Sequence, residues 1–149
     1  MSSSLRIGEL AERAGCLVET IRYYERLGLM PAPGRSLGNY RLYGDTHVDR
    51  LLFIRRCRSL GMSLAETKQL LDLHDAPNRI CRDIDRLIDD HIVRVNDRLA
   101  ELQALQLQLK RLRSQCHRVR TVKECGILKS LKDEGNTGRR QARRRAAPA

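Results

Sequence analysis

Three of the five cysteines in this chain are spaced in a way that suits metal binding. Cys116 and Cys125 bracket eight residues in the stretch SQCHRVRTVKECGIL. This spacing is too wide for a C-x-x-C redox pair or a usual zinc-ribbon knuckle. A third cysteine, Cys81, lies 35 residues before Cys116. An odd number of cysteines does not suggest a disulfide framework, so metal binding or burial is the better interpretation.

The segment between Cys81 and Cys116 has the pattern of a long coiled-coil helix, since it contains neither Pro nor Gly. A stripe sustained over five heptads predicts a coiled coil, and therefore a homodimer. An amphipathic helix folded onto its own domain fits a segment of this length less well. The apolar repeat is Ile88, Val95, Leu102 and Leu109, with Ile84, His91, Leu105 and Leu112 at companion positions and a polar interruption at Arg98.

The heptad register places Cys81 and Cys116 on the same face of this helix. At ~1.5 Å per residue they are roughly 52 Å apart, so they cannot share a ligand within one chain. In a parallel dimer each cysteine would meet its own copy. In an antiparallel dimer Cys81 of one subunit would meet Cys116 and Cys125 of its partner, which gives two three-thiol sites per dimer.

Three thiolates without a carboxylate select soft, thiophilic metals over hard ones. Zinc in a structural site would need a fourth ligand, such as His117, His91 or a water. The remaining two cysteines have a different interpretation. Cys57 lies within a predicted helix and is expected to be a buried, inert thiol. Cys16 lies in a predicted turn, where packing or a role in tuning the metal response both remain open.

No arrangement of residues indicates catalysis. The chain has no Ser-His-Asp arrangement that can be read, no Gly-rich phosphate loop and no H-E-x-x-H motif, so an enzyme is not expected. His47 and His74 fall at predicted helix ends, where capping or a solvated surface is the expected role.

The elements before the long helix have the dimensions of a helix-turn-helix. Residues 7–14 and about 18–27 read as two short helices, ended by Gly15 and Gly28. The second helix presents side chains that can reach phosphates and base edges. These side chains are Thr20, Arg22, Tyr23 and Arg26.

The stretch PAPGRSLGNYRLYGD predicts a short two-stranded hairpin, or wing, with its turn at Gly38-Asn39. Its Arg35, Arg41 and Tyr43 suit contacts with the DNA backbone. A helix then starts at Asp45 and ends at Gly61. A second follows the capping-box pattern at Ser63–Glu66 and runs to about residue 74.

The predicted fold class is all-α with a small β wing, in which a winged helix-turn-helix domain precedes a long antiparallel coiled-coil dimerisation helix. The predicted divisions are residues 1–75 for the DNA-binding domain and 76–115 for a linker and the dimerisation helix. Residues 116–132 form a metal-binding loop and short C-terminal helix, and 133–149 an Arg-rich disordered tail.

Charge supports a polyanionic partner. The chain carries a net charge of +11, with 29 Lys and Arg against 18 Asp and Glu, which points to nucleic acid. There is no apolar leader and no run long enough for a membrane span, so a cytoplasmic protein with no membrane partner is expected.

These parts, in this order, resemble the MerR family of bacterial metal-responsive regulators up to about Lys132. The stretches IGELAERAGCLVETIRYYERLGLMPAPGRS and GNYRLYGDTHVDRLLFIRRCRSLGMSLAETKQLL carry the resemblance, and three motif cysteines match at Cys81, Cys116 and Cys125. The ending CGIL, together with Cys16, looks most like the cadmium/lead-responsive branch. The zinc branch usually carries an extra thiol where this chain has His117.

The resemblance implies a homodimer that binds double-stranded promoter DNA with an overlong spacer and works with RNA polymerase. Binding of Cd(II) or Pb(II) would distort the DNA until both promoter elements face the polymerase. The ligands would be the three motif cysteines. The implied DNA contacts are Thr20, Arg22 and Tyr23 in the second helix and Asn39, Arg41 and Tyr43 in the wing.

Three alternatives remain open from the sequence. The mercury branch shares the cysteine spacing, so Hg(II) is an alternative inducer, with Zn(II) a further one. A thiol-redox regulator would use a disulfide between Cys116 and Cys125 and would not need Cys81. A zinc-stapled DNA-binding protein without an inducer would lose its dimer when the metal is chelated.

Overall fold

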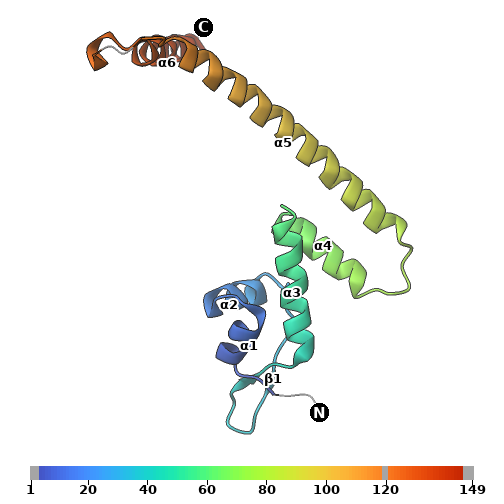
Figure 1. Cartoon of the computed structure of the whole chain (residues 1–149). Helices are drawn as coiled ribbons and strands as arrows, with labels where there is room; N and C mark the ends of the chain where they lie inside the picture. Colours follow the sequence, from blue (N-terminus) through green and yellow to red (C-terminus); the bar gives the residue numbers. More distant parts are fainter. Residues whose placement is uncertain (1–3, 119–120, 146–149) are drawn as a thin grey trace. The chain divides into compact units, whose positions relative to one another are not determined.

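The computed structural model describes residues 4–118 and 121–145, with side chains described as far as residue 135. As predicted, the chain is mostly helical, carries a two-stranded antiparallel wing and contains one very long helix (Figure 1). The elements are α1 (Ile7–Ala14), α2 (Val18–Arg26), β1 (Gly34–Arg35), β2 (Arg41–Leu42), α3 (Asp45–Ser59), α4 (Leu64–His74), α5 (Arg82–Ser114), the 3-10 helix η1 (Val122–Glu124) and α6 (Gly126–Arg145).

The chain divides into two compact units, residues 1–91 and 92–149, and the division falls within α5. The first turns of α5 belong to the first unit because they pack on α3, α4 and the turn between them. Nothing in the described part of the chain is both long and apolar enough, as a helix, to cross a membrane. The cluster at the base of α5 consists of Cys57, Met62 and Leu70, with Ile84, Leu87 and Ile88 packed against it.

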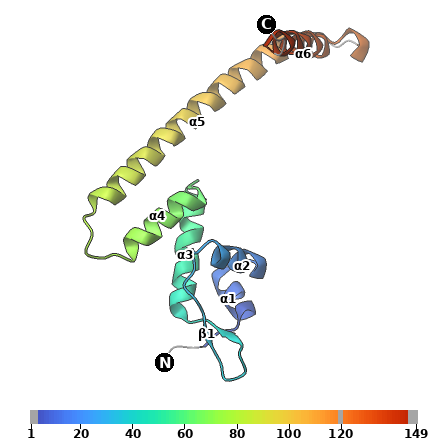
Figure 2. The same ribbon diagram turned by 180° about the vertical axis from the view of Figure 1, so that it is seen from behind.

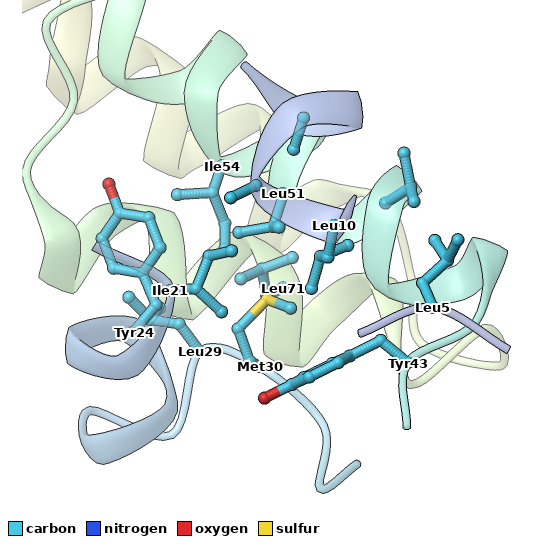
Figure 3. Packing of buried hydrophobic residues seen from close by; sticks show 13 residues of the cluster. Leu5, Leu10, Ile21, Tyr24, Leu29, Met30, Tyr43, Leu51, Ile54 and Leu71 are labelled. Carbon is cyan, nitrogen blue, oxygen red and sulfur yellow. The ribbon is translucent and has the colours of Figure 1, made fainter. Parts of the chain in front are cut away.

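The helix-turn-helix forms because α1 packs on both α2 and α3, and all three helices place buried side chains in one cluster (Figure 2). The turn between the two short helices requires Gly15, which has a φ of 63° and closes α1 with its own N–H. Ile21 of α2 and Ile54 of α3 are completely buried. Figure 3 shows the cluster that these side chains form. Its labelled members are Leu5, Leu10, Ile21, Tyr24, Leu29, Met30, Tyr43, Leu51, Ile54 and Leu71.

The predicted wing is present as a short hairpin. Gly34 pairs with Leu42, and Arg35 pairs with Arg41. Asn39 sits in the turn at a φ of 60°, a left-handed conformation that Asn tolerates better than most residues. A backbone bridge between Leu5 and Tyr43 ties the base of the hairpin to the N-terminal segment.

Side-chain caps fix the starts of α3 and α4. At α4, the Glu66 N–H donates to Ser63 Oγ at 3.1 Å and the Ser63 N–H donates to Glu66 Oε2 at 2.8 Å. This is the predicted capping box. At α3, the Gly44 N–H donates to His47 Nδ1 at 3.0 Å, so His47 has the expected capping role. His47 is nonetheless buried rather than solvated.

The C-terminal helix corrects one prediction. Residues 133–149 were expected to be disordered, but α6 continues to Arg145. After the weak helix formers GNTG at 135–138 the helix resumes its favourable composition, because residues 139–145 are RRQARRR and every one of these is a good helix former. They extend a helix whose first turns pack on α5 within the second unit. Residues 146–149 lie outside the described part of the chain.

Candidate functional site

A basic recess lies between the second helix of the helix-turn-helix and the wing. It has a volume of about 370 Å³ and contains four arginines and no carboxylate among its lining residues. Three predicted DNA contacts, Arg22, Asn39 and Arg41, line it together. An anionic group such as a phosphate matches this lining by charge and by hydrogen-bond donors. The remaining lining residues are Arg6, Ile7, Arg35 and Tyr40.

The wing side of the recess is held by contacts within the chain. Arg35 Nη1 donates to Asn39 Oδ1 at 2.7 Å, and the Tyr40 N–H donates to Ser36 Oγ at 3.2 Å. The Arg6 guanidinium lies over the Tyr40 ring, 5.5 Å from its centroid. Sequence reasoning missed Arg6 and Tyr40. The available signals were an arginine directly before the first helix and an aromatic residue beside the wing turn.

The outer face of α2 presents the other predicted contacts. Arg22 and Tyr23 are exposed and Thr20 is half-buried. The Arg26 guanidinium lies over the Tyr23 ring, 5.7 Å from its centroid, so the two side chains form one exposed platform. These residues are therefore accessible on the helix that the sequence predicted for recognition.

Tyr43 differs from its prediction. Its side chain is only 1% exposed, and its hydroxyl donates to Glu25 Oε1 at 2.6 Å. Burial, with Glu25 beside it, raises the pKa of Tyr43, so the phenol is neutral. Its ring also packs edge-on against His47, with centroids 5.2 Å apart. In this structure Tyr43 is a core residue that joins the wing to α2 and α3 rather than an exposed contact.

Cys81 is exposed at the start of the long helix. Its carbonyl accepts the Ile84 N–H at 2.9 Å and the Asp85 N–H at 3.1 Å, so it forms the first turn of α5. The backbone of Cys81 is thus fixed while its thiol remains accessible. This is the position that the heptad pattern predicted, at the beginning of the apolar stripe.

Cys116 and Cys125 lie at the two ends of the loop between α5 and α6, and both are half-buried. Arg113 Nη1 donates to the Cys116 carbonyl at 2.8 Å, and the Cys116 thiol faces the Arg118 carbonyl at 3.6 Å. The Cys125 carbonyl accepts the Lys129 N–H at 3.1 Å, which places Cys125 directly at the N-terminus of α6.

The ends of this loop touch. A Cβ atom on Gly126 would lie 2.5 Å from the carbonyl oxygen of Gln115, a separation that a side chain cannot adopt. Gln115 precedes Cys116, and Gly126 follows Cys125. Glycine at position 126 therefore lets the backbone beside one cysteine close on the backbone beside the other.

The described residues of one chain do not gather three metal-ligating side chains at any point. Cys81 belongs to the first compact unit, whereas Cys116 and Cys125 belong to the second. The donor set of three accessible or half-buried thiols still fits a thiophilic metal. His117 is an exposed neighbour of Cys116.

The other two cysteines are packed side chains. Cys57 is 5% exposed, and burial raises the pKa of its thiol, as expected for an inert core cysteine. Cys16 packs against the main core. Burial raises the pKa of Cys16 as well, an effect that the nearby Arg55 charge reduces.

The sequence matches two related protein families. Residues 5–73 match the family described as MerR HTH family regulatory protein, and residues 48–112 match the family described as MerR, DNA binding. A Haemophilus influenzae protein named HTH-type transcriptional regulator ZntR homolog is 48% identical over 109 residues, or 73% of this chain and 81% of that protein. The mercuric resistance operon regulatory protein of Bacillus cereus is 40% identical over 129 residues, or 85% of this chain and 96% of that protein.

Solved structures agree with these relatives. The transcription regulator PbrR691 from Ralstonia metallidurans CH34, in complex with lead(II), is 52% identical with a TM-score of 0.78. The match covers 85% of this chain and 98% of that one. The regulator MerR from Bacillus megaterium MB1, in complex with mercury(II), is 35% identical with a TM-score of 0.68, over 86% and 99% of the two chains.

Proposed function

Because the chain belongs to the MerR family of helix-turn-helix regulators, we propose that it is a promoter-bound activator induced by Cd(II) or Pb(II). Its relatives are metal-responsive transcriptional regulators rather than enzymes, and the chain is a regulator of the same kind. The finer parts of the proposal are the ligands, the metal, the dimer and the mechanism on DNA.

The proposed ligands are Cys81 of one subunit with Cys116 and Cys125 of its partner. The observation that carries this assignment is the closed loop, in which Gly126 lies against Gln115 and so brings two thiol-bearing segments together. Cys81 stands at the opposite end of a 33-residue helix, which spans about 50 Å at 1.5 Å per residue. An antiparallel dimer is the arrangement that supplies the third thiol to each loop.

The homodimer is supported by the apolar face of α5. Val95, Leu102 and Leu109 are about half exposed in the single chain, and they repeat at seven-residue intervals. Such a stripe is stable in water when a second helix covers it. The dimer does not depend on the metal, because the stripe is complete without it.

On DNA, the proposed contacts of each subunit are Thr20, Arg22 and Tyr23 on α2 and Asn39 and Arg41 on the wing. An antiparallel dimer presents two such surfaces to one duplex. The proposed activation mechanism is the one that the resemblance to the MerR family implies. DNA with an overlong promoter spacer is bent and untwisted until both promoter elements face RNA polymerase. Smooth bending of such a site costs roughly 1–6 kcal/mol, which protein–DNA contacts must offset. The bound metal supplies a difference in affinity between two conformations of the dimer.

Lead or cadmium is preferred because of the donor set and the relative solved with lead(II), which is 52% identical. Mercury(II) is the second candidate, because a relative 35% identical was solved with that ion. Zinc is less well matched, since the three thiols lack a fourth protein ligand in this assignment.

The first test replaces each proposed ligand in turn. Cys81→Ser, Cys116→Ser and Cys125→Ser should each abolish metal-induced transcription while leaving promoter affinity within about twofold, because ligands and DNA contacts lie on separate elements. Cys57→Ser is the matched control, and it should retain full induction. Retained induction in Cys81→Ser would favour a two-thiol redox regulator, which peroxide would then induce without metal.

The second test addresses the shared site directly. One subunit carries Cys81→Ser, and its differently tagged partner carries both Cys116→Ser and Cys125→Ser. Each homodimer lacks a complete site, but the antiparallel mixed dimer regains one. We expect one tightly bound Pb(II) or Cd(II) per purified mixed dimer, measured by competition with a thiol chelator. A value of zero would contradict the shared site.

A further inference from the structure

The histidine at position 91 does not face a partner helix, although its heptad position predicted this. His91 is only 9% exposed and lies at the end of the first compact unit, on the third turn of α5. It packs into the turn that joins α3 and α4. His91 is neither a proposed metal ligand nor a proposed DNA contact. It lies on the helix that follows Cys81, and it packs against the unit that carries the proposed DNA contacts.

Both ring nitrogens of His91 are engaged. Nδ1 lies 2.9 Å from Glu66 Oε1, and Nε2 lies 3.0 Å from the carbonyl oxygen of Leu60. The Glu66 side chain is itself mostly buried, with 15% of its surface exposed. Its other oxygen accepts the Ser63 N–H at the start of α4. The His91 imidazole thus joins α5 to Leu60, which directly follows α3, and to the capping box at the start of α4.

The hydrogen-bond donors and acceptors of His91 match those of its two partners. The Leu60 carbonyl is an acceptor, so Nε2 donates to it. Nδ1 then either donates to an ionised Glu66 or accepts from a protonated one. In both cases the pair is neutral as a whole and every polar atom has a partner. Removing either member leaves a buried polar group unsatisfied, which is costly.

The turn that receives His91 contains a glycine in the left-handed conformation. Gly61 follows Leu60 with a φ of 81°, and its Cα faces the imidazole, since a Cβ there would lie 3.9 Å from Nε2. Leu60 closes α3, the helix against which α1 packs. The His91 imidazole thus contacts the residue that closes α3 and a residue in the first turn of α4.

We propose that His91, held by Glu66, is the positioning residue through which the metal state of the dimer reaches the DNA-binding unit. The inference rests on the proposed function, since it takes Cys81 as a ligand. Cys81 lies ten residues earlier on the same helical segment, about 15 Å away along its axis. A shift of α5 on metal binding moves the imidazole, and the two hydrogen bonds carry that shift to the turn between α3 and α4.

The test measures coupling rather than activity. Pb(II) affinity is determined for the dimer alone and for the dimer on its promoter duplex, and the ratio of the two constants is the coupling. In His91→Leu we expect this ratio to fall at least about fivefold toward one. The number of Pb(II) ions bound per dimer should be unchanged. The affinity of the metal-free dimer for DNA should stay within twofold of the wild-type value.

Glu66 supplies a conservative pair of variants. In Glu66→Gln, the amide oxygen can accept the Ser63 N–H while the amide nitrogen donates to a neutral His91, so the coupling ratio should be retained. Glu66→Leu breaks both contacts and should lose the coupling as His91→Leu does. The double variant His91→Leu/Glu66→Leu should lose no more coupling than either single change, because both single changes remove the same His91–Glu66 contact.

A buried histidine elsewhere in the same unit provides the control. His47→Gln keeps an acceptor for the Gly44 N–H and should lower the melting temperature without changing the coupling ratio. A normal ratio in folded His91→Leu and in Glu66→Leu would overturn the inference. If His91→Leu does not fold, the comparison of the coupling ratios of Glu66→Leu and Glu66→Gln tests the inference. A wild-type ratio of one would overturn the inference alone, whereas a wild-type dimer that binds no Pb(II) would refute the proposed function itself.

Discussion

The two compact units differ in how far a single chain completes them. In residues 4–91 the apolar side chains close over one another, and Ile21, Leu51 and Ile54 are completely buried. From Ile92 to residue 135, leaving aside 119 and 120, no side chain reaches that degree of burial. Val95, Leu102 and Leu109 keep about half of their surface in contact with water. One chain therefore specifies a finished DNA-binding unit and one half of an interface.

The largest expected effect tests the second unit, in which a single chain leaves the apolar stripe of α5 exposed. Leu102→Glu places a charge in the centre of the proposed coiled coil twice per dimer, and burial of an unpaired charge costs several kcal/mol. We expect the dissociation constant of the dimer to rise by at least about 100-fold, measured by sedimentation equilibrium. The first unit should stay folded, as seen in its thermal transition.

Leu107 provides the matched control for this change. It is 51% exposed, close to the 48% of Leu102, but it lies off the heptad stripe. Leu107→Glu should leave the dimer intact. Dissociation by Leu107→Glu and not by Leu102→Glu would show that a different face of α5 makes the interface.

A core truncation tests the first unit, in which a single chain buries its own apolar side chains. Ile54→Ala removes a fully buried side chain from the centre of the main cluster (Figure 3) and should lower the free energy of unfolding of this unit by about 2–5 kcal/mol. Leu107→Ala should change it by less than about 0.5 kcal/mol. Urea denaturation, followed by circular dichroism, measures both. Similar losses in the two variants would mean that the units do not differ in self-sufficiency.

A third comparison separates DNA contacts in the two units. Arg22→Ala should weaken binding to the cognate promoter by roughly 10- to 100-fold, the usual value of one good base or phosphate contact in a recess. Deletion of residues 138–149 should mainly lower the dependence of binding on salt concentration. Fluorescence anisotropy at several salt concentrations distinguishes the two. Loss of specific binding on the deletion alone would move the recognition surface to the second unit.

The smallest effect concerns the ion pair between α3 and the end of α4. Arg50 Nη1 contacts both carboxylate oxygens of Asp75 at 2.7 Å, and this hydrogen bond lowers the pKa of Asp75. A lowered folded-state pKa stabilises the protein above the unfolded pKa of about 4, and the gain disappears as the pH falls through the lower folded value.

Asp75 is half exposed, so solvent screens the pair. Asp75→Asn should cost less than about 1 kcal/mol at pH 7. The difference from wild type should vanish as the pH falls through the lowered folded-state pKa of Asp75, as measured by urea midpoints across the acid range. A difference that persists there would show that the carboxylate charge is not its source.

Local patterns were enough to predict much of the fold. The heptads between Cys81 and Cys116 predicted the helix that became α5, and the Ser63–Glu66 capping box appears with both of its hydrogen bonds. Such features depend on residues three, four or seven apart. The burial of Cys57 was also expected from its place among the apolar residues of one helix.

Two differences from prediction, at Tyr43 and His91, share one physical origin, which is packing between residues distant in sequence. Tyr43 looked like a wing contact, but Glu25 of α2 holds its hydroxyl, 18 residues away. His91 looked like a coiled-coil residue, but Glu66 and Leu60 take its nitrogens from 25 and 31 residues away. A periodic pattern cannot indicate which of two surfaces a polar aromatic ring will join.

The contact between Gly126 and Gln115 has a consequence for affinity. The ten residues between Gln115 and Gly126 form a loop that closes at an entropic cost of about 2 kcal/mol, and the packing of the backbone at its two ends offsets that cost. In the proposed metal site, these two thiols would act as a chelate, with a high effective concentration of the second ligand once the first is bound. The proposed third thiol comes from another chain, so its effective concentration would depend on how firmly the two helices are joined.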